Sequence, residues 1–261
     1  MTSAWRYSEM IHVGICGAGG RMGQRIIKIV KETPEVALFG LIERPDHEKI
    51  GSSVDGVTLT SDISEGISDC DVIIDFSSTG TTLELISECE KKGVSVVIGT
   101  TGFDEGQVSL IKEAAKNIPV LLSPNMSIGV NLLFKIVKEI TSKLPEYEKE
   151  IIEAHHNRKV DAPSGTARKI ADIISDEHSK LVYGRDGKPG PRDMSEIGIH
   201  AVRAGSIVGE HTIMWAGPDD RIELTHRAGS RGIFASGAVK AAIWLNGQSA
   251  GRLYTMEDVL N

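Results

Sequence analysis

The chain has 261 residues, of which 40% are hydrophobic and 25% are charged, a typical globular composition with room for one large domain or two modest ones. Its formal net charge of -7 argues against a general binder of nucleic acids or membrane surfaces, because phosphate contacts need a surplus of lysine and arginine. Three cysteines without CxxC spacing, no apolar targeting segment and no run of about 18 apolar residues together predict a soluble protein of the reducing cytoplasm.

The first half of the chain alternates short apolar runs with segments of helical spacing. Strands are predicted at 11–16, 36–43, 71–76, 94–101 and 119–123. Helices are predicted from residue 21 to the break at Pro34, at 81–92 and at 105–117. Alternating strands and helices indicate an α/β domain with a Rossmann-like, doubly wound parallel sheet.

The pattern changes after Asn125. A helix at 130–144 leads into a strand at 148–156, and longer strands follow at 198–205, 207–215 and 220–228. Their partial alternation predicts a second, α+β domain with a mixed or antiparallel sheet buried on one face. The helical segment 234–247 is expected to pack back on the first domain. The predicted division is therefore 1–126 with 235–261 for dinucleotide binding, and 127–234 for substrate binding and oligomerisation.

The stretch GAGGRMG (17–23) follows the first strand and opens a helix. A glycine-rich turn in this place presents backbone N–H groups and a helix N-terminus to a pyrophosphate, whereas the alternative is a tight turn that binds nothing. Glu43 ends the second strand, where a carboxylate can bind the ribose hydroxyls of NAD, and Arg44 can pair with the 2′-phosphate of NADP. The alternative for both is a solvated charge pair.

Two further strand ends are candidate cofactor contacts. Gly99–Gly102 and Ser123–Met126 each follow a predicted parallel strand, and ligands of open α/β sheets gather beyond the carboxyl ends of the strands. We expect these loops to contact the nicotinamide half of a dinucleotide, with plain connecting loops as the alternative. Asn125–Gly129 and Phe234 are also expected to act as hinges.

The stretch EAHHNRKVDAPSGTA (153–167) has three candidate chemistries: a metal site, a hydrolase nucleophile or a cradle for an acidic substrate. His155 and His156 lie on a predicted strand and should point to opposite faces, which disfavours zinc and leaves no expected metal site. Pro163 precedes Ser164, so the GxSxG elbow of a hydrolase is missing. Ser164 is better placed as the N-cap of a helix whose start attracts anions.

A cradle for a carboxylate is therefore the favoured interpretation. Lys159 supplies a positive charge, a histidine can move a proton near neutral pH, and Asp161 can orient Lys159 by charge pairing. The alternative without a binding function is a polar loop with a capped helix and solvent-facing histidines.

Five stretches taken in order resemble the family of 4-hydroxy-tetrahydrodipicolinate reductase, also called dihydrodipicolinate reductase. They are GAGGRMG (17–23), the Glu43–Arg44 pair, GTTGF (99–103), EAHHNRKVDAPSGTA (153–167) and VRAGSIVGEHT (202–212). The match runs from about Ile11 to Leu260. The fourth stretch is highly specific to this family, whereas many dehydrogenases share the glycine loop.

The resemblance implies a homotetramer of two-domain subunits that acts in diaminopimelate and lysine biosynthesis. It implies that (2S,4S)-4-hydroxy-2,3,4,5-tetrahydrodipicolinate is reduced to tetrahydrodipicolinate by NADH or NADPH, with release of water. His155 is implied as proton donor and acceptor and Lys159 as proton donor. His156, Gly165 and Thr166, with Ser164 at the helix start, are implied to bind substrate carboxylate.

The same resemblance implies a set of residues that line the cofactor: Gly17, Ala18, Gly19, Gly20, Arg21, Met22, Glu43, Arg44, Gly99, Thr100, Thr101, Ser123, Pro124, Asn125 and Met126. Two alternatives stay open. One is another Rossmann amino-acid or keto-acid dehydrogenase, similar to aspartate dehydrogenase, against which the 153–167 stretch speaks. The other is a non-catalytic NAD(P) sensor, which would have no reason to keep Lys159 and His155.

Overall fold

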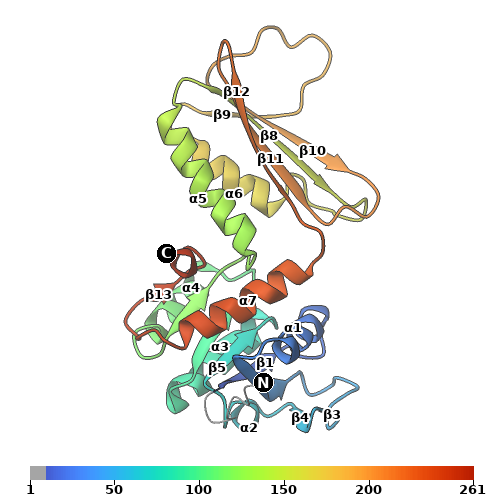
Figure 1. Ribbon diagram of the computed structural model, residues 1–261, viewed down its shortest axis with the longest axis vertical. Coiled ribbons are helices and arrows are strands. Elements are labelled where there is room, and N and C mark those ends of the chain that lie inside the picture. The colour runs from blue at the N-terminus through green and yellow to red at the C-terminus, as the bar shows by residue number, and fades with distance from the viewer. Residues whose placement is uncertain (1–9) are drawn as a thin grey trace, which may run out of the picture. The chain divides into compact units, whose positions relative to one another are not determined.

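A computed structural model describes residues 10–261 of the chain (Figure 1). The chain divides into two compact units. One runs to Ile128 and resumes at Phe234–Asn261, and the other is Gly129–Ile233. Each unit has a sheet and hydrophobic clusters of its own.

The first unit is built on an eight-stranded sheet in the order β13-β7-β6-β5-β1-β2-β4-β3. All its strand pairs are parallel except the antiparallel pair of β3 with β4. The strand bounds are β1 Ile11–Cys16, β2 Val36–Ile42, β3 Ser53–Val54, β4 Val57–Thr60, β5 Val72–Asp75, β6 Ser95–Ile98, β7 Val120–Leu122 and β13 Leu253–Tyr254. The predicted Rossmann-like, mostly parallel sheet is confirmed.

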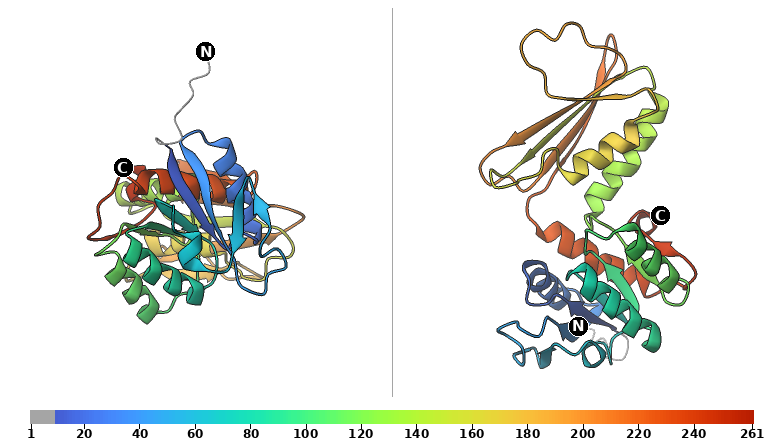
Figure 2. Two further views of the ribbon diagram at one scale, coloured as in Figure 1. Left: turned by 90° about the horizontal axis from the view of Figure 1, so that it is seen from below. Right: turned by 180° about the vertical axis from the view of Figure 1, so that it is seen from behind.

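Helices cover both faces of this sheet (Figure 2). They are α1 Arg21–Glu32, α2 Ile63–Gly66, α3 Thr79–Lys92, α4 Glu105–Ala114 and α7 Gly232–Leu245. α1 and α7 share one hydrophobic cluster with the sheet, and α3 and α4 share the other. Because apolar residues lie on both sides of the central strands, these strands read as continuous apolar runs in the sequence. The expected packing of the C-terminal helix on the first unit is confirmed.

The second unit has a five-stranded mixed sheet in the order β12-β11-β8-β10-β9. β10 runs parallel to β8 and β9, whereas β11 runs antiparallel to β8 and β12. Two helices lie on one face of this sheet, as Figures 1 and 2 show. The bounds are α5 Ile128–Lys143, β8 Glu148–His155, α6 Gly165–Ile174, β9 Lys180–Tyr183, β10 Glu196–Arg203, β11 Glu210–Ala216 and β12 Arg221–Arg227, and a short 3-10 helix closes the chain at Asp258–Leu260. The predicted mixed sheet with one buried face is confirmed.

The differences from the prediction lie in short elements and at strand ends. The pairs β3–β4 and β13–β7 join only two residues of each strand, and such short pairings leave no periodic signal in the sequence. The predicted strands 36–43, 71–76, 94–101 and 119–123 run one to three residues past the ends of β2, β5, β6 and β7. These extra residues form the loops at the carboxyl edge of the sheet, where the predicted cofactor contacts lie.

No helix in the described part of the chain, residues 10–261, has the length and apolar character needed to cross a membrane.

Gly237 in α7 gives a test of close packing in the first unit. A Cβ at this position would collide with the carbonyl oxygen of Met126, whereas a Cβ at the exposed Gly80 of α3 would meet nothing within 4 Å. Gly237→Ala should therefore lower the free energy of unfolding by about 1–3 kcal/mol through overpacking. Gly80→Ala should leave it unchanged or raise it by up to about 1 kcal/mol. Denaturation followed by circular dichroism measures both, and equal effects of the two substitutions would refute the packing assigned to α7.

Candidate functional site

The glycine loop of the first unit lies between β1 and α1. Gly17 has a φ of 79°, a left-handed conformation that favours glycine. Gly20 is the N-cap of α1, and no side chain caps this helix start. A Cβ on Gly23 would collide with the carbonyl oxygen of Gly17, so the third glycine lets the helix begin close to the strand. The uncapped start of α1 is suited to bind an anionic group.

Glu43 follows β2 and lies against this loop. Its carboxylate accepts hydrogen bonds from the backbone N–H groups of Gly19, at 2.9 Å, and Arg44, at 3.0 Å. The exposed Arg44 side chain pairs with Asp46 at 3.2 Å. The structure therefore brings the predicted acidic residue to the glycine loop and leaves the arginine at the surface beside it.

The loops after β5 and β6 are tied together by a carboxylate that the sequence did not single out. Asp75 is fully buried at the end of β5. It accepts hydrogen bonds from the hydroxyls of Ser77 (2.5 Å), Thr82 (2.6 Å) and Thr100 (2.8 Å). Burial raises the pKa of Asp75, and the hydroxyl donors partly oppose this rise. Thr100 thus points into the protein, while the neighbouring Thr101 is exposed.

The loop after β7 is held by its own side chains. The buried Ser123 hydroxyl donates to the carbonyl of Asn125 at 2.9 Å, and the Asn125 amide oxygen accepts from the Ser127 N–H at 2.9 Å. The Met126 side chain is 1% exposed and lies in the hydrophobic cluster under α7, while Pro124 is exposed. A ligand at this loop would therefore meet backbone and the Pro124 ring rather than the Met126 side chain.

In the second unit, the predicted catalytic histidine contacts a buried acid. Nδ1 of His155 lies 2.6 Å from a carboxylate oxygen of Glu153, and the two side chains lie on the same face of β8. The Arg203 guanidinium donates to both oxygens of Glu153, at 2.8 and 2.7 Å. Burial acts to raise the pKa of Glu153, but the hydrogen bonds from Arg203 and His155 outweigh it and lower that pKa. Burial lowers the pKa of His155, and Glu153 only partly offsets this, so the neutral form of the ring predominates at pH 7.

Ser164 connects this pair to the start of α6. Its N–H donates to Glu153 at 3.0 Å, and its hydroxyl accepts from the N–H of Ala167 at 3.2 Å, which confirms the predicted N-cap. The same hydroxyl lies 3.0 Å from Nε2 of His211. Burial lowers the pKa of His211 to about 4, so this ring is also neutral at pH 7.

The loop between β8 and α6 carries the predicted cation. The ammonium of Lys159 lies 2.9 Å from Asp161, so the predicted charge pair is present. The positive charge of Lys159 also acts to lower the pKa of His155. His156 is turned to a different partner from His155, since its Nε2 lies 3.3 Å from the Arg231 guanidinium. Gly165 and Thr166 form the first turn of α6. His155, Lys159 and the helix start thus belong to one part of the second unit.

Two alternatives lose support from this geometry. Among residues 10–261, no group of three or more His, Cys, Asp or Glu side chains is placed to hold a metal ion. Ser164 and His211 are paired as in a hydrolase, but Nδ1 of His211 is buried and has no hydrogen-bond partner in the described chain. A hydrolase triad needs an acid at that nitrogen to orient the ring.

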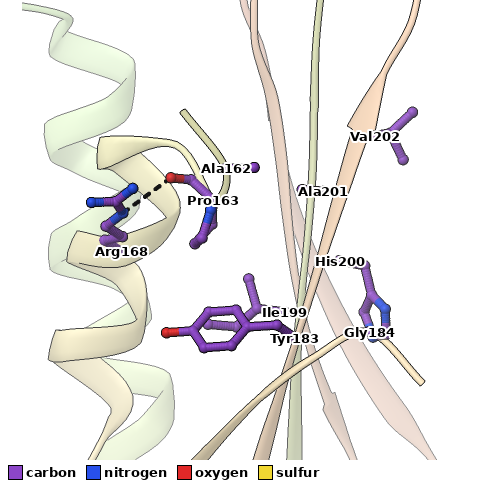
Figure 3. A pocket seen from close by; sticks show the side chains of 9 residues that line it. All are labelled: Ala162, Pro163, Arg168, Tyr183, Gly184, Ile199, His200, Ala201 and Val202. Atoms are coloured by element: carbon purple, nitrogen blue, oxygen red, sulfur yellow. Dashed lines mark hydrogen bonds between the residues drawn. The ribbon is translucent and has the colours of Figure 1, made fainter. Parts of the chain in front are cut away.

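A hollow of about 670 Å³ lies beside the start of α6 rather than at His155 and Lys159 (Figure 3). In Figure 3, Tyr183 and Ile199 point toward α6, whereas His200 and Val202 point to the other face of the sheet. Its described lining is Ala162, Pro163, Arg168, Tyr183, Gly184, Ile199, His200, Ala201 and Val202. The hollow lies at the edge of the sheet, where β9 ends at Tyr183 while β10 continues to Arg203.

Sequence reasoning missed Glu153, Arg203, Asp75 and His211. Glu153 had a usable signal, because residues two apart on a strand share a face and the acid lies two residues before His155. Asp75 had a weaker sequence signal, because it is a carboxylate at the end of the apolar run VIID. Arg203 reaches Glu153 only through the pairing of β10 with β8, which the sequence does not reveal.

Comparison with known proteins agrees with this architecture. Models of the N-terminus and the C-terminus of dihydrodipicolinate reductase match residues 11–126 and 129–260. The 4-hydroxy-tetrahydrodipicolinate reductase of Hahella chejuensis is 45% identical over 96% of this chain and 99% of its own length. Those of Pelobacter propionicus and Geobacter metallireducens are 43% and 42% identical, with the same coverage.

A solved structure of dipicolinate-bound dihydrodipicolinate reductase from Paenisporosarcina sp. TG-14 has a TM-score of 0.80 and 28% identity, covering 95% of this chain and 99% of that one. A probable dehydrogenase from Thermotoga maritima, with a TM-score of 0.63 and 17% identity, shares the fold. The resemblance inferred from the motifs is confirmed, because the two family models span both units and the relatives match over nearly their full length: the chain belongs to the dihydrodipicolinate reductase family.

Proposed function

We propose that this protein reduces 4-hydroxy-tetrahydrodipicolinate to tetrahydrodipicolinate with NADH or NADPH, in the cytoplasmic synthesis of diaminopimelate and lysine. The reaction adds a hydride and a proton to the substrate and releases one water. The name shared by its curated relatives supports this reaction. The observation that carries it in the structure is the grouping of a buried Glu153–His155 pair, the Lys159 cation and the start of α6.

The first unit has the features that a dinucleotide requires. A glycine N-cap without a side-chain cap suits a pyrophosphate, and the Glu43 carboxylate beside Gly19 suits an adenosine ribose. Bound in this way, the nicotinamide supplies the hydride. We assign Gly17 to Met22, Glu43, Arg44, Gly99 to Thr101 and Ser123 to Met126 to its binding, with Thr100 and Met126 acting through their backbones because both side chains are buried.

The second unit is assigned to the substrate. A dicarboxylate needs positive charge and N–H donors, which Lys159 and the first turn of α6 at Gly165 and Thr166 supply, with His156 beside them. Hydride addition pushes electrons toward the ring nitrogen, and a nearby proton donor lowers that barrier. Because His155 is neutral and Lys159 is cationic, we assign Lys159 as the proton donor and His155 as the group that accepts and returns a proton.

Activity tests the proposal directly. The purified protein should oxidise NADH or NADPH when freshly prepared substrate is added, and Lys159→Ala should lower kcat by about 10²-fold or more, the usual loss for a positioned acid. NADH binding, followed by its fluorescence, should change little. Lys169→Ala on the exposed side of α6 is the matched control and should keep its activity. Native protein that binds NADH without oxidising it would instead indicate a nucleotide sensor.

Cofactor preference follows from the charge pair at the end of β2. Glu43→Ala should raise KM for NADH more than for NADPH, because it removes the partner of the ribose hydroxyls. Arg44→Ala should do the reverse, because it removes a cation for the 2′-phosphate. Steady-state kinetics with both cofactors measure the two ratios. Equal changes for NADH and NADPH would rule out the ribose assignment.

We also propose that the second unit assembles the protein into a homotetramer. The helices α5 and α6 cover only one face of its sheet, and the other face exposes apolar side chains, with Ile152 at 38% and Val202 at 44% exposed. Glu150 on that face is covered by Arg185 and Arg192 from the loop after β9. An apolar patch rimmed by paired charges is typical of a subunit interface.

Ile152→Asp tests this interface, because it places a charge on the exposed sheet face without touching the buried one. The native chain should have the mass of four subunits by light scattering, and the variant should dissociate into smaller species. Leu110→Asp on the first unit, where Leu110 is 58% exposed, is the control and should remain tetrameric. A monomeric native protein would refute the proposal.

A further inference from the structure

Glu153 is the one fully buried carboxylate of the second unit among the described residues. One of its oxygens accepts from Arg203 at 2.7 Å and from the Ser164 N–H at 3.0 Å. The other accepts from Arg203 at 2.8 Å and lies 2.6 Å from Nδ1 of His155. Burying a carboxylate is costly unless every oxygen is paired, and here a bidentate guanidinium and two further donors meet that requirement.

The pairing fixes the proton of His155. An ionised carboxylate only accepts hydrogen bonds, so the nitrogen that faces it must carry a hydrogen. In the neutral ring the proton therefore sits on Nδ1, and Nε2 holds the lone pair. Nε2 faces Gly209, where a Cβ would lie only 3.1 Å away. The histidine side chain keeps 11% of its surface exposed.

We propose that Glu153 is a positioning residue that holds His155 with its proton on Nδ1 and its Nε2 free to accept a proton from the substrate side. Through the Ser164 N–H, the same carboxylate also fixes the start of α6 relative to the histidine. One buried group thus sets both the proton acceptor and the helix turn that is assigned to the carboxylate. This role rests on the proposed function, in which His155 moves a proton.

A purely structural role for Glu153 makes a different prediction. The Arg203–Glu153 pair joins β10 to β8, so its loss alone would destabilise the unit without changing the ring nitrogen that carries the proton. Glu153→Gln separates the two roles. Its amide oxygen would keep one Arg203 N–H and the Ser164 N–H as donors, and its amide NH₂ would face His155 and lose the second hydrogen bond from Arg203. Because the NH₂ group donates, the histidine proton must move from Nδ1 to Nε2.

The test is ¹⁵N nuclear magnetic resonance of the histidine rings in the full-length protein at a pH where they are neutral. The His155 signals are assigned by comparison with His155→Asn. The native protein should show a protonated Nδ1, and Glu153→Gln should show a protonated Nε2. The kcat of this variant should fall by about 10²-fold or more, with NADH binding unchanged. Glu139→Gln removes an exposed carboxylate of α5 and is the control. It should change neither the protonated nitrogen of His155 nor kcat.

Several results would overturn the inference. A native His155 protonated on Nε2 would do so without any variant, so the test holds even if Glu153→Gln fails to fold. If the native protein is active, the inference would also be overturned by a folded Glu153→Gln variant that keeps the native kcat. A variant whose His155 proton stays on Nδ1 would overturn it as well. An inactive native protein with the proton on Nδ1 would instead refute the reductase function and leave the Glu153–His155 pairing standing.

Discussion

One partly buried ion pair, that of Glu153 with Arg203, connects the main parts of the proposed substrate site. It joins the neighbouring strands β8 and β10 through two hydrogen bonds, and its carboxylate also receives the start of α6 and the ring of His155. A carboxylate removed from water cannot remain ionised without such partners, so the loop that we assign to the substrate and the strands β8 and β10 stabilise one another. The geometry of the proposed substrate site follows from this requirement.

The first unit also has a buried carboxylate that connects loops, but its hydrogen-bond donors are uncharged. Asp75 also lies buried at a strand end and collects donors from neighbouring loops, but its donors are hydroxyls and a backbone N–H rather than a guanidinium. Neutral dipoles do not outweigh the burial of the charge, so the pKa of Asp75 is raised while that of Glu153 is lowered. In each unit one acidic residue orders loops that the sequence assigned to a ligand.

Much of the fold was predictable because it rests on local patterns. Strands buried on both faces appear as unbroken apolar runs, and the glycine loop shows its place by following the first of them. The helix N-cap at Ser164 and the Lys159–Asp161 pair were also predictable, since their partners lie within three residues. Arg203 lies 50 residues from Glu153 and reaches it through strand pairing, and His211 lies 47 residues from Ser164. Such contacts are decided by register, which one sequence does not reveal.

We propose that a common fold acquires a specific reaction here because one unit binds the cofactor and the other binds the substrate. The T. maritima dehydrogenase shares the fold at 17% identity. The residues that we assign to the substrate lie within 153–167, which the second unit holds on β8, the following loop and α6. In this proposal, the residues of one loop and the carboxylate of Glu153 direct a fold that transfers hydride to a dicarboxylate.

A crystal structure with NADH and dipicolinate bound together would test the proposed substrate and cofactor sites. We expect the Lys159 ammonium and the N–H groups of Gly165 and Thr166 to contact the carboxylates of dipicolinate, with Nε2 of His155 facing its ring. The nicotinamide carbon that carries the hydride should then lie about 3–3.5 Å from the dipicolinate ring, the distance expected for a reacting pair. A Lys159 ammonium and a first turn of α6 that face away from the bound dipicolinate would refute the proposed substrate site.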